Sequence, residues 1–176
     1  MIRRLAHIIL RFARDDDGTS TIPFALWMPI MIGIIITTME LGIMSIRHTT
    51  LERSLDLTVR DVRLGVLTNP THRALKESIC EKAPVLNDCD SHLRLEMIRL
   101  DARNWTNPTR TATCVDTAEL SEPDITFSAG GNELMFLRAC YKFQPLTATR
   151  WIGSAINKDG QGYSALVSMS AFVVEP

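Results

Sequence analysis

Four cysteines are the residues of this chain whose chemistry is easiest to assign: Cys80, Cys89, Cys114 and Cys140. All four lie C-terminal to a long apolar run, and an even number of cysteines in an exported domain is typical of disulfides. Four cysteines allow three pairings, and the sequence does not exclude any of them. We favour Cys80–Cys89, which closes a short loop through Pro84, and Cys114–Cys140, which joins two segments with β-like patterns.

The histidines do not complete a metal site or a catalytic set. The chain has four, and they are scattered: His7, His48, His72 and His92. Cys89 lies close to His92, but no second pair accompanies them and no C-x-x-C pattern of the zinc-binding kind occurs. No Ser-His-Asp or Cys-His combination and no glycine-rich phosphate loop is apparent. We therefore expect no metal, no cofactor and no enzymatic activity.

The element that must hold the cysteine-bearing part in place is an uncharged apolar run from Ile22 to Met39. The hydrocarbon core of a bilayer needs about 20 apolar residues, so this run is just long enough to span it. It is comfortably long if residues 40–46 continue it, and Glu40 then lies near the outer interface with its carboxylate reaching water. The run predicts a membrane anchor with Trp27 at its inner interface.

A basic leader precedes the apolar run and ends in three aspartates followed by Gly18. In an ordinary secretory signal the cleavage site follows the apolar stretch, whereas Gly18 precedes it. Basic residues beside a span favour the cytoplasm, and the leader carries Arg3, Arg4, Arg11 and Arg14. We expect the N-terminus inside and the C-terminal part outside. The simplest alternative is that Gly18 only links the leader to the span.

Helical periodicity continues past the apolar run as far as Gly65, with apolar residues at Leu51, Leu55, Val59 and Val62. This pattern predicts one helix of about 40 residues whose outer half packs on a domain. A second, short helix is expected at 71–81. Strands are expected at residues 92–101, 133–143 and 163–174, with polar residues on a solvent-facing side, a weaker signal at 111–115 and turns at 130–132 and 159–162.

Length and composition fit one anchor and one small α+β domain, with the short helix and an antiparallel sheet of three to four strands. The chain has 176 residues, 45% of them hydrophobic, and a formal net charge of −1. No block of positive charge follows the leader, which argues against nucleic-acid binding. The expected parts are a leader (1–18), a transmembrane part of the helix (19–46), its extramembrane half (47–66) and an exported domain with two disulfides (67–176).

One motif carries a resemblance to a known family. It consists of Asp17, Gly18, Ile22, Phe24, Ala25, Leu26 and Pro29, followed by the apolar span and Met39-Glu40-Leu41-Gly42. Over residues 12–65 the chain resembles the TadE/TadF-like minor pseudopilins of tight-adherence (Flp-type) pili. The rest resembles the family only in its helix-plus-strands plan and its cysteines.

The resemblance implies a location, a processing step and partners. Such proteins are inserted in the bacterial inner membrane, with the C-terminal domain in the periplasm, and a prepilin peptidase cuts them on the cytoplasmic face. Here the cut falls between Gly18 and Thr19. The mature subunit then takes part in pilus assembly through its apolar helix, with expected contacts to other pilins, pseudopilins and the assembly platform at Phe24, Pro29, Glu40 and Gly42.

Pro23 departs from the family pattern. The fifth residue after the cut is usually a glutamate that pairs with a neighbouring subunit's new amino terminus, and proline supplies no charge. Glu40 lies 21 residues beyond Thr19, about 32 Å along a helix, and cannot replace it in the same layer. Two interpretations stay open: a cleaved subunit at a site that needs no such pairing, such as a tip or initiation complex, or an uncleaved, membrane-anchored binding or sensing domain.

Overall fold

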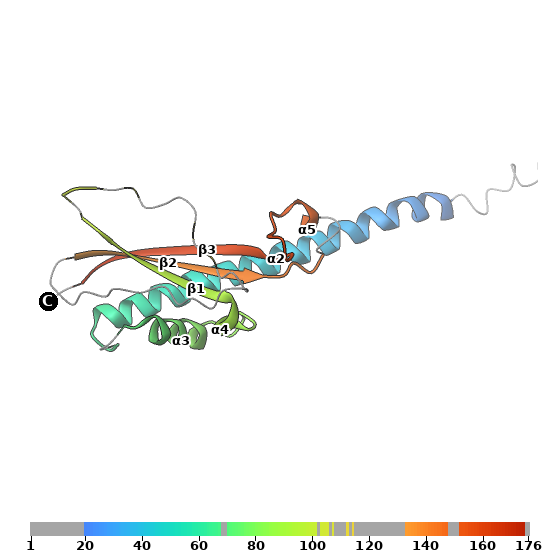
Figure 1. The fold of residues 1–176 in the computed structure, drawn as a ribbon. Helices are drawn as coiled ribbons and strands as arrows, with labels where there is room; N and C mark the ends of the chain where they lie inside the picture. The colour runs from blue at the N-terminus through green and yellow to red at the C-terminus, as the bar shows by residue number, and fades with distance from the viewer. Residues whose placement is uncertain are drawn as a thin grey trace, which may run out of the picture. The chain divides into compact units, whose positions relative to one another are not determined.

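The chain adopts an α+β fold, as predicted from the sequence. The computed structural model describes residues 20–67, 70–101, 103–105, 107, 112, 114, 133–147 and 152–174. The elements in chain order are α2 (Thr21–Arg63), α3 (His72–Lys82), α4 (Cys89–His92), β1 (Leu93–Leu100), β2 (Glu133–Phe143), α5 (Ile152–Ala155) and β3 (Ser164–Val174) (Figure 1). The predicted leader, the predicted turn at 130–132 and most of the weak strand signal at 111–115 lie outside the described residues.

Two compact units make up the chain, Met1–Met39 and Glu40–Pro176, and the boundary between them falls within α2. The described part of the first unit is a helical segment. The second unit holds the remainder of α2, the other helices and the sheet. The predicted single helix of about 40 residues is confirmed, since α2 contains 43.

The sheet has three antiparallel strands in the order β1-β2-β3, with β2 in the centre. The register places Leu95 opposite Ala139, which in turn lies opposite Ser168. All three strongly predicted strands are confirmed to within one residue at each end. The predicted turn before β3 is also present, because the Gly162 N–H donates to the Asp159 carbonyl at 3.0 Å and the φ of Gly162 is +86°.

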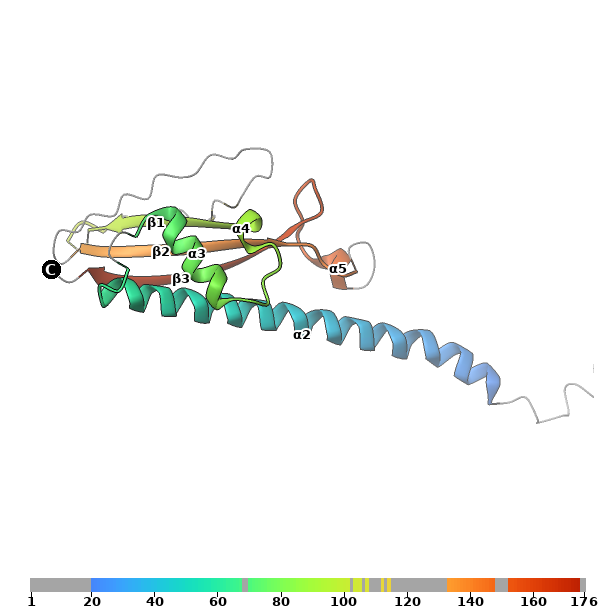
Figure 2. The same cartoon turned by 90° about the horizontal axis from the view of Figure 1, so that it is seen from below.

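The core lies between one face of the sheet and two helices. The C-terminal half of α2 and the whole of α3 lie on the same side of the sheet, and Figure 2 shows them side by side from below. The apolar residues of α2 that were predicted to pack on a domain are buried in this core: Leu51, Leu55, Val59 and Val62. Strand residues from the facing side complete it, including Leu93, Leu95, Met135, Leu137 and Tyr141.

A left-handed glycine ends α2. The φ of Gly65 is +68°, a conformation that side chains with a Cβ disfavour. The Gly65 N–H donates to the Val62 carbonyl at 3.1 Å, and the Val66 N–H donates to the Asp61 carbonyl at 3.0 Å. These two bonds form a Schellman motif that satisfies carbonyls left free at the helix end, and Gly65 closes the helix as predicted.

Helix α3 is held against α2 by polar contacts as well as by the core. It begins after Thr71, whose hydroxyl accepts a bond from the Ala74 N–H at 3.3 Å. At its other end the Lys82 ammonium donates to Asp61 at 2.5 Å and to Ser78 at 2.7 Å. The predicted helix at 71–81 is confirmed with a shift of one residue.

Two disulfides are present, Cys80–Cys89 and Cys114–Cys140, which is the pairing that we favoured from the sequence. The first joins α3 to α4 with a Cα–Cα distance of 5.7 Å, and the second joins residue 114 to the central strand at 5.3 Å. Both cross-links restrict the unfolded chain, which favours the folded state.

The expectation that the polar residues of the strands all face solvent is wrong for Arg138. Its side chain is only 5% exposed and donates to the Glu96 carboxylate at 3.3 Å across β1 and β2. Its guanidinium also lies over the Phe136 ring at 5.4 Å. A charge this deeply buried needs such partners, since an unpaired buried charge is strongly destabilising.

Candidate functional site

The N-terminal segment of α2 exposes its apolar side chains. Ile22, Phe24 and Trp27 are each at least 64% exposed, and most of the apolar residues as far as Met39 are more than 40% exposed. Only 6% of the most apolar 18-residue window of this helix is buried. A core helix of a soluble protein would have that surface covered, so this helix has both the length and the surface needed to cross a membrane.

The four residues that the resemblance implies as helix contacts differ in their exposure to solvent. Phe24 and Pro29 are exposed, as is Gly42, and a Cβ added at Gly42 would meet no atom within 4 Å. These three positions are therefore open to a partner. The predicted processing site, Gly18 and Thr19, lies outside the described residues.

Glu40 has a different environment from the one we predicted. Its side chain is only 5% exposed, and its carboxylate accepts bonds from the Thr147 N–H at 3.3 Å and from the Thr147 hydroxyl. The expectation that this carboxylate reaches water is wrong, because the connection between β2 and β3 passes against α2 at this point. Glu40 therefore ties the start of the second unit to a segment 107 residues away.

Helix α5 holds Thr147 in place through a close backbone approach. Gly153 is buried, and a Cβ built on it would overlap the Thr147 carbonyl. Only glycine fits this position without displacing Thr147. The Glu40–Thr147 contact thus depends on Gly153 as well as on its own two residues.

Replacing Thr147 with valine should destabilise the fold by about 1–2 kcal/mol, because a buried carboxylate loses its hydroxyl donor at nearly unchanged volume. The matched control is Thr49→Val on α2, the helix that carries Glu40. The Thr49 hydroxyl is exposed and donates to the Ser45 carbonyl, and we expect a change within about 0.5 kcal/mol there. Urea unfolding of the two variants beside the parent protein measures both effects, and equal losses would contradict the assigned role of Thr147.

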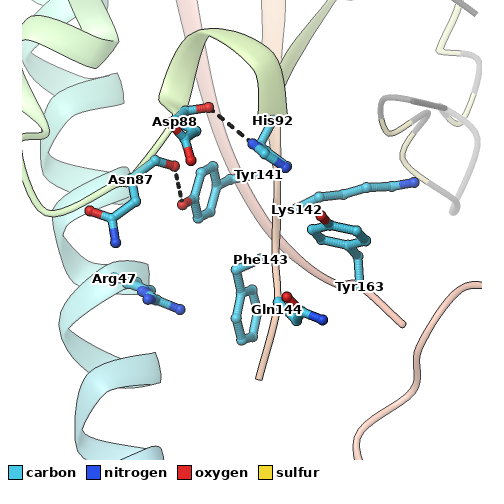
Figure 3. Close-up of a pocket in the computed structure, with 9 residues that line it drawn as sticks. All are labelled: Arg47, Asn87, Asp88, His92, Tyr141, Lys142, Phe143, Gln144 and Tyr163. Atoms are coloured by element: carbon cyan, nitrogen blue, oxygen red, sulfur yellow. Dashed lines mark hydrogen bonds between the residues drawn. The ribbon is translucent and has the colours of Figure 1, made fainter. Parts of the chain in front are cut away.

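A pocket lies at the end of β2 where α2, α4 and the start of β3 meet (Figure 3). Its volume is about 200 Å³. Nine residues line it: Arg47, Asn87, Asp88, His92, Tyr141, Lys142, Phe143, Gln144 and Tyr163. Most of them carry polar or aromatic groups, so the pocket is suited to a small polar ligand rather than to an apolar one.

Arg47 is a cation of this pocket that forms no direct ion pair with a described residue, although the Asp88 carboxylate lines the same pocket. Its guanidinium lies over the Phe143 ring at 5.4 Å, and its Nε is buried with no hydrogen-bond partner. A buried N–H of a charged group without an acceptor carries a desolvation cost that a bound anion would offset.

Three of the other groups in the pocket, on Tyr141, His92 and Lys142, contact neighbouring residues. The Tyr141 hydroxyl donates to the Asn87 carbonyl at 2.8 Å; burial raises the pKa of Tyr141, and the Arg47 charge partly opposes this rise. The His92 ring lies 5.4 Å from the Tyr163 ring. Lys142 donates to the Asp159 carboxylate at 2.8 Å and is therefore already paired.

The Lys142–Asp159 pair predicts an acid-sensitive term in the stability. The hydrogen bond from Lys142, followed by the one from the Tyr163 N–H, holds the pKa of Asp159 below its ordinary value of 3.8. A lowered carboxyl pKa stabilises the folded state fully above pH 3.8, and this contribution disappears as the pH falls through the folded-state pKa. We expect Asp159→Asn to unfold at a lower temperature than the parent at pH 6, and the difference to shrink toward zero as the pH falls below 3.8 and through the folded-state pKa of Asp159. A difference that is constant over this range would contradict the assignment.

The sequence analysis did not predict this pocket. Its residues come from four separate parts of the chain, and no local pattern joins them. The one available signal was Arg47, the first basic residue after the apolar run. The tyrosines at the ends of two predicted strands were a weaker indication.

Comparisons with known protein families, with curated proteins and with solved structures found no match. The resemblance to TadE/TadF-like pseudopilins therefore rests on the residues of this sequence that carry the motif.

Proposed function

We propose that this protein is a membrane-anchored, exported subunit that acts in the assembly of a tight-adherence pilus as a minor pseudopilin. One observation supports this best: a single helix joins an exposed, apolar N-terminal segment to a C-terminal half that is packed on an antiparallel sheet. An apolar helix of this kind can lie in lipid and can then pack against the apolar helices of other subunits. The leader and the motif around Gly18 support cleavage by a prepilin peptidase before assembly.

The membrane-embedded part of α2 in this proposal is Thr21–Met39. Its 19 residues rise about 28 Å, which matches a hydrocarbon core of about 30 Å. The burial of Glu40 against Thr147 supports an outer limit at Met39, since the segment that contains Thr147 covers one side of the helix at Glu40. The hydrocarbon boundary is thus seven residues earlier than the limit at residue 46 expected from the sequence. The arginines of the leader favour a cytoplasmic N-terminus and a periplasmic domain.

Pro23 limits where in a pilus such a subunit could act. It lies in the first turn of α2, where its missing N–H is not needed, and it provides no carboxylate for a neighbour's amino terminus. The proposal therefore places the subunit at a tip or in an initiation complex. Its partners are the inner membrane, the prepilin peptidase, other pilins and pseudopilins, and the assembly platform.

The second candidate function is an uncleaved, single-pass anchor that carries a periplasmic binding or sensing domain. The Arg47 pocket favours it, because a structural subunit has no evident need for an unpaired cation in a cavity.

Photo-crosslinking tests the proposed helix contacts. A photoreactive amino acid at Phe24, which is 64% exposed, should form adducts with other pilin-class subunits in cells that produce the pilus. The same amino acid at Leu64, which is 66% exposed and directly follows the C-terminal end of α2, should not form these adducts. Adducts of these subunits with position 64 and none with position 24 would contradict the proposal.

A further inference from the structure

We propose that the Arg47 pocket binds the phosphate group of an anionic lipid headgroup at the outer surface of the membrane. This inference rests on the membrane anchoring in the proposed function, but not on pilus assembly. It assigns a ligand to a cavity whose charge, size and place along α2 each point to the same chemistry.

The positive charge of the pocket includes the Nε group of Arg47. Its N–H is buried and has no acceptor, while the flat side of the guanidinium is occupied by the Phe143 ring. The two terminal Nη groups are not buried in this way and form no hydrogen bond or ion pair with a residue in the described ranges, so they are the part that can bind a ligand. A planar guanidinium donates two parallel hydrogen bonds to a phosphate, which is the geometry in which arginine binds anions most strongly. His92, Gln144 and Tyr163 line the same pocket and can supply further donors.

The pocket is too small to enclose a whole drug-sized molecule. Pockets for drug-sized molecules usually enclose about 300–1,000 Å³, whereas this one encloses about 200 Å³. A single phosphate group fits this space while the rest of its molecule stays outside. A lipid headgroup has this form, because its acyl chains remain in the bilayer.

Arg47 lies on α2 just beyond the outer end of the proposed membrane span. The proposed hydrocarbon span ends at Met39, and Arg47 follows it by eight residues, about 12 Å of helix, whereas the headgroup layer adds about 5–8 Å on each side of the hydrocarbon core. Leu41 and Ile46 are still 46% and 53% exposed, so an apolar strip continues on one side up to the residue before Arg47. Side chains on a helix lean toward its N-terminus, which here is the membrane side. Arg47 therefore reaches the depth of the lipid phosphates.

Asp88 allows the effect of charge to be tested in the opposite direction. Its carboxylate lines the pocket and repels an anion there, so its removal should strengthen binding. Asp88 is exposed, makes no ion pair with any described residue, and has a φ of 49°. Asparagine tolerates this left-handed conformation, so Asp88→Asn removes the charge with little effect on the backbone. A gain in lipid binding by this variant could not result from misfolding.

Native mass spectrometry of the full chain in detergent, titrated with phosphatidylglycerol, measures the binding. We expect Arg47→Gln to weaken the affinity about tenfold and Tyr163→Phe about threefold, since each removes a donor. Asp88→Asn should strengthen it about threefold. The matched control, Arg53→Gln, removes an exposed arginine of the same helix and should leave the affinity unchanged. A second titration uses inorganic phosphate to distinguish a free anion from a lipid.

Three results would overturn the proposal. They are an unchanged affinity in Arg47→Gln, an equal loss in Arg53→Gln, and Arg47-dependent binding of inorganic phosphate without any lipid binding. Alkaline extraction of membranes separates these outcomes from a failure of the proposed function. A chain that is released by alkali lacks the anchor, whereas a retained chain without Arg47-dependent lipid binding refutes only the pocket's ligand.

Discussion

Replacing Ile30 and Ile34 with aspartate should remove the protein from the alkali-resistant membrane fraction. Both side chains are more than half exposed on the N-terminal segment of α2. An aspartate at the centre of a membrane helix costs about 2.5–3.5 kcal/mol, so two cost about 5–7 kcal/mol, or about four to five orders of magnitude in partitioning. Fractionation of cells after alkaline extraction, followed by detection of the chain in pellet and supernatant, gives the result directly.

The matched control introduces the same charges outside the proposed span. Leu64 and Val66 are 66% and 71% exposed, so their replacement with aspartate changes a comparably exposed apolar surface. That double variant should stay in the membrane pellet. Retention of the Ile30/Ile34 variant in the pellet would contradict the assignment of Thr21–Met39 as the anchor.

Truncating Leu55 to alanine should destabilise the second unit by about 3 kcal/mol. Leu55 is fully buried in the core between α2 and the sheet, and Leu→Ala changes at such sites cost about 2–5 kcal/mol through lost transfer energy and the cavity left behind. For a chain of this length the melting temperature should fall by about 6–12 °C. Thermal unfolding of the full chain in detergent measures the change.

Leu57 provides the control on the same helix. It is 37% exposed and does not belong to the buried core, so Leu57→Ala should cost less than about 1 kcal/mol. Similar melting temperatures for the two variants would show that the outer half of α2 is not packed on the sheet in the way described.

The elements that the sequence predicts well are those whose signal is local and repeated. The buried positions on α2 recur at helical spacing, and the strands alternate over eight to eleven residues, so each element is specified many times over. The end of α2 was also predictable, because Gly65 is needed for a left-handed cap. The periodic placement of apolar residues along the sequence thus predicts the fold class without any tertiary information.

Single charges were predicted poorly, because their environment is tertiary. The partner of Glu40 lies 107 residues further on, and that of Arg138 lies 42 residues back on a different strand. A carboxylate at the end of an apolar run is expected to reach water unless another segment covers it, and no local pattern reveals such a segment. The same holds for Arg47, whose missing partner becomes visible only when β2, α4 and β3 surround it.

The intact mass of the protein, extracted from the membranes of cells with an active prepilin peptidase, tests the central proposal most directly. Cleavage between Gly18 and Thr19 removes the basic leader and leaves Thr19 as the first residue of the mature chain. Cells that lack the peptidase serve as the control and should yield only the uncleaved chain. We predict a chain that begins at Thr19 in the cells with the peptidase, and a chain that still begins at Met1 in those cells would contradict the processed pseudopilin.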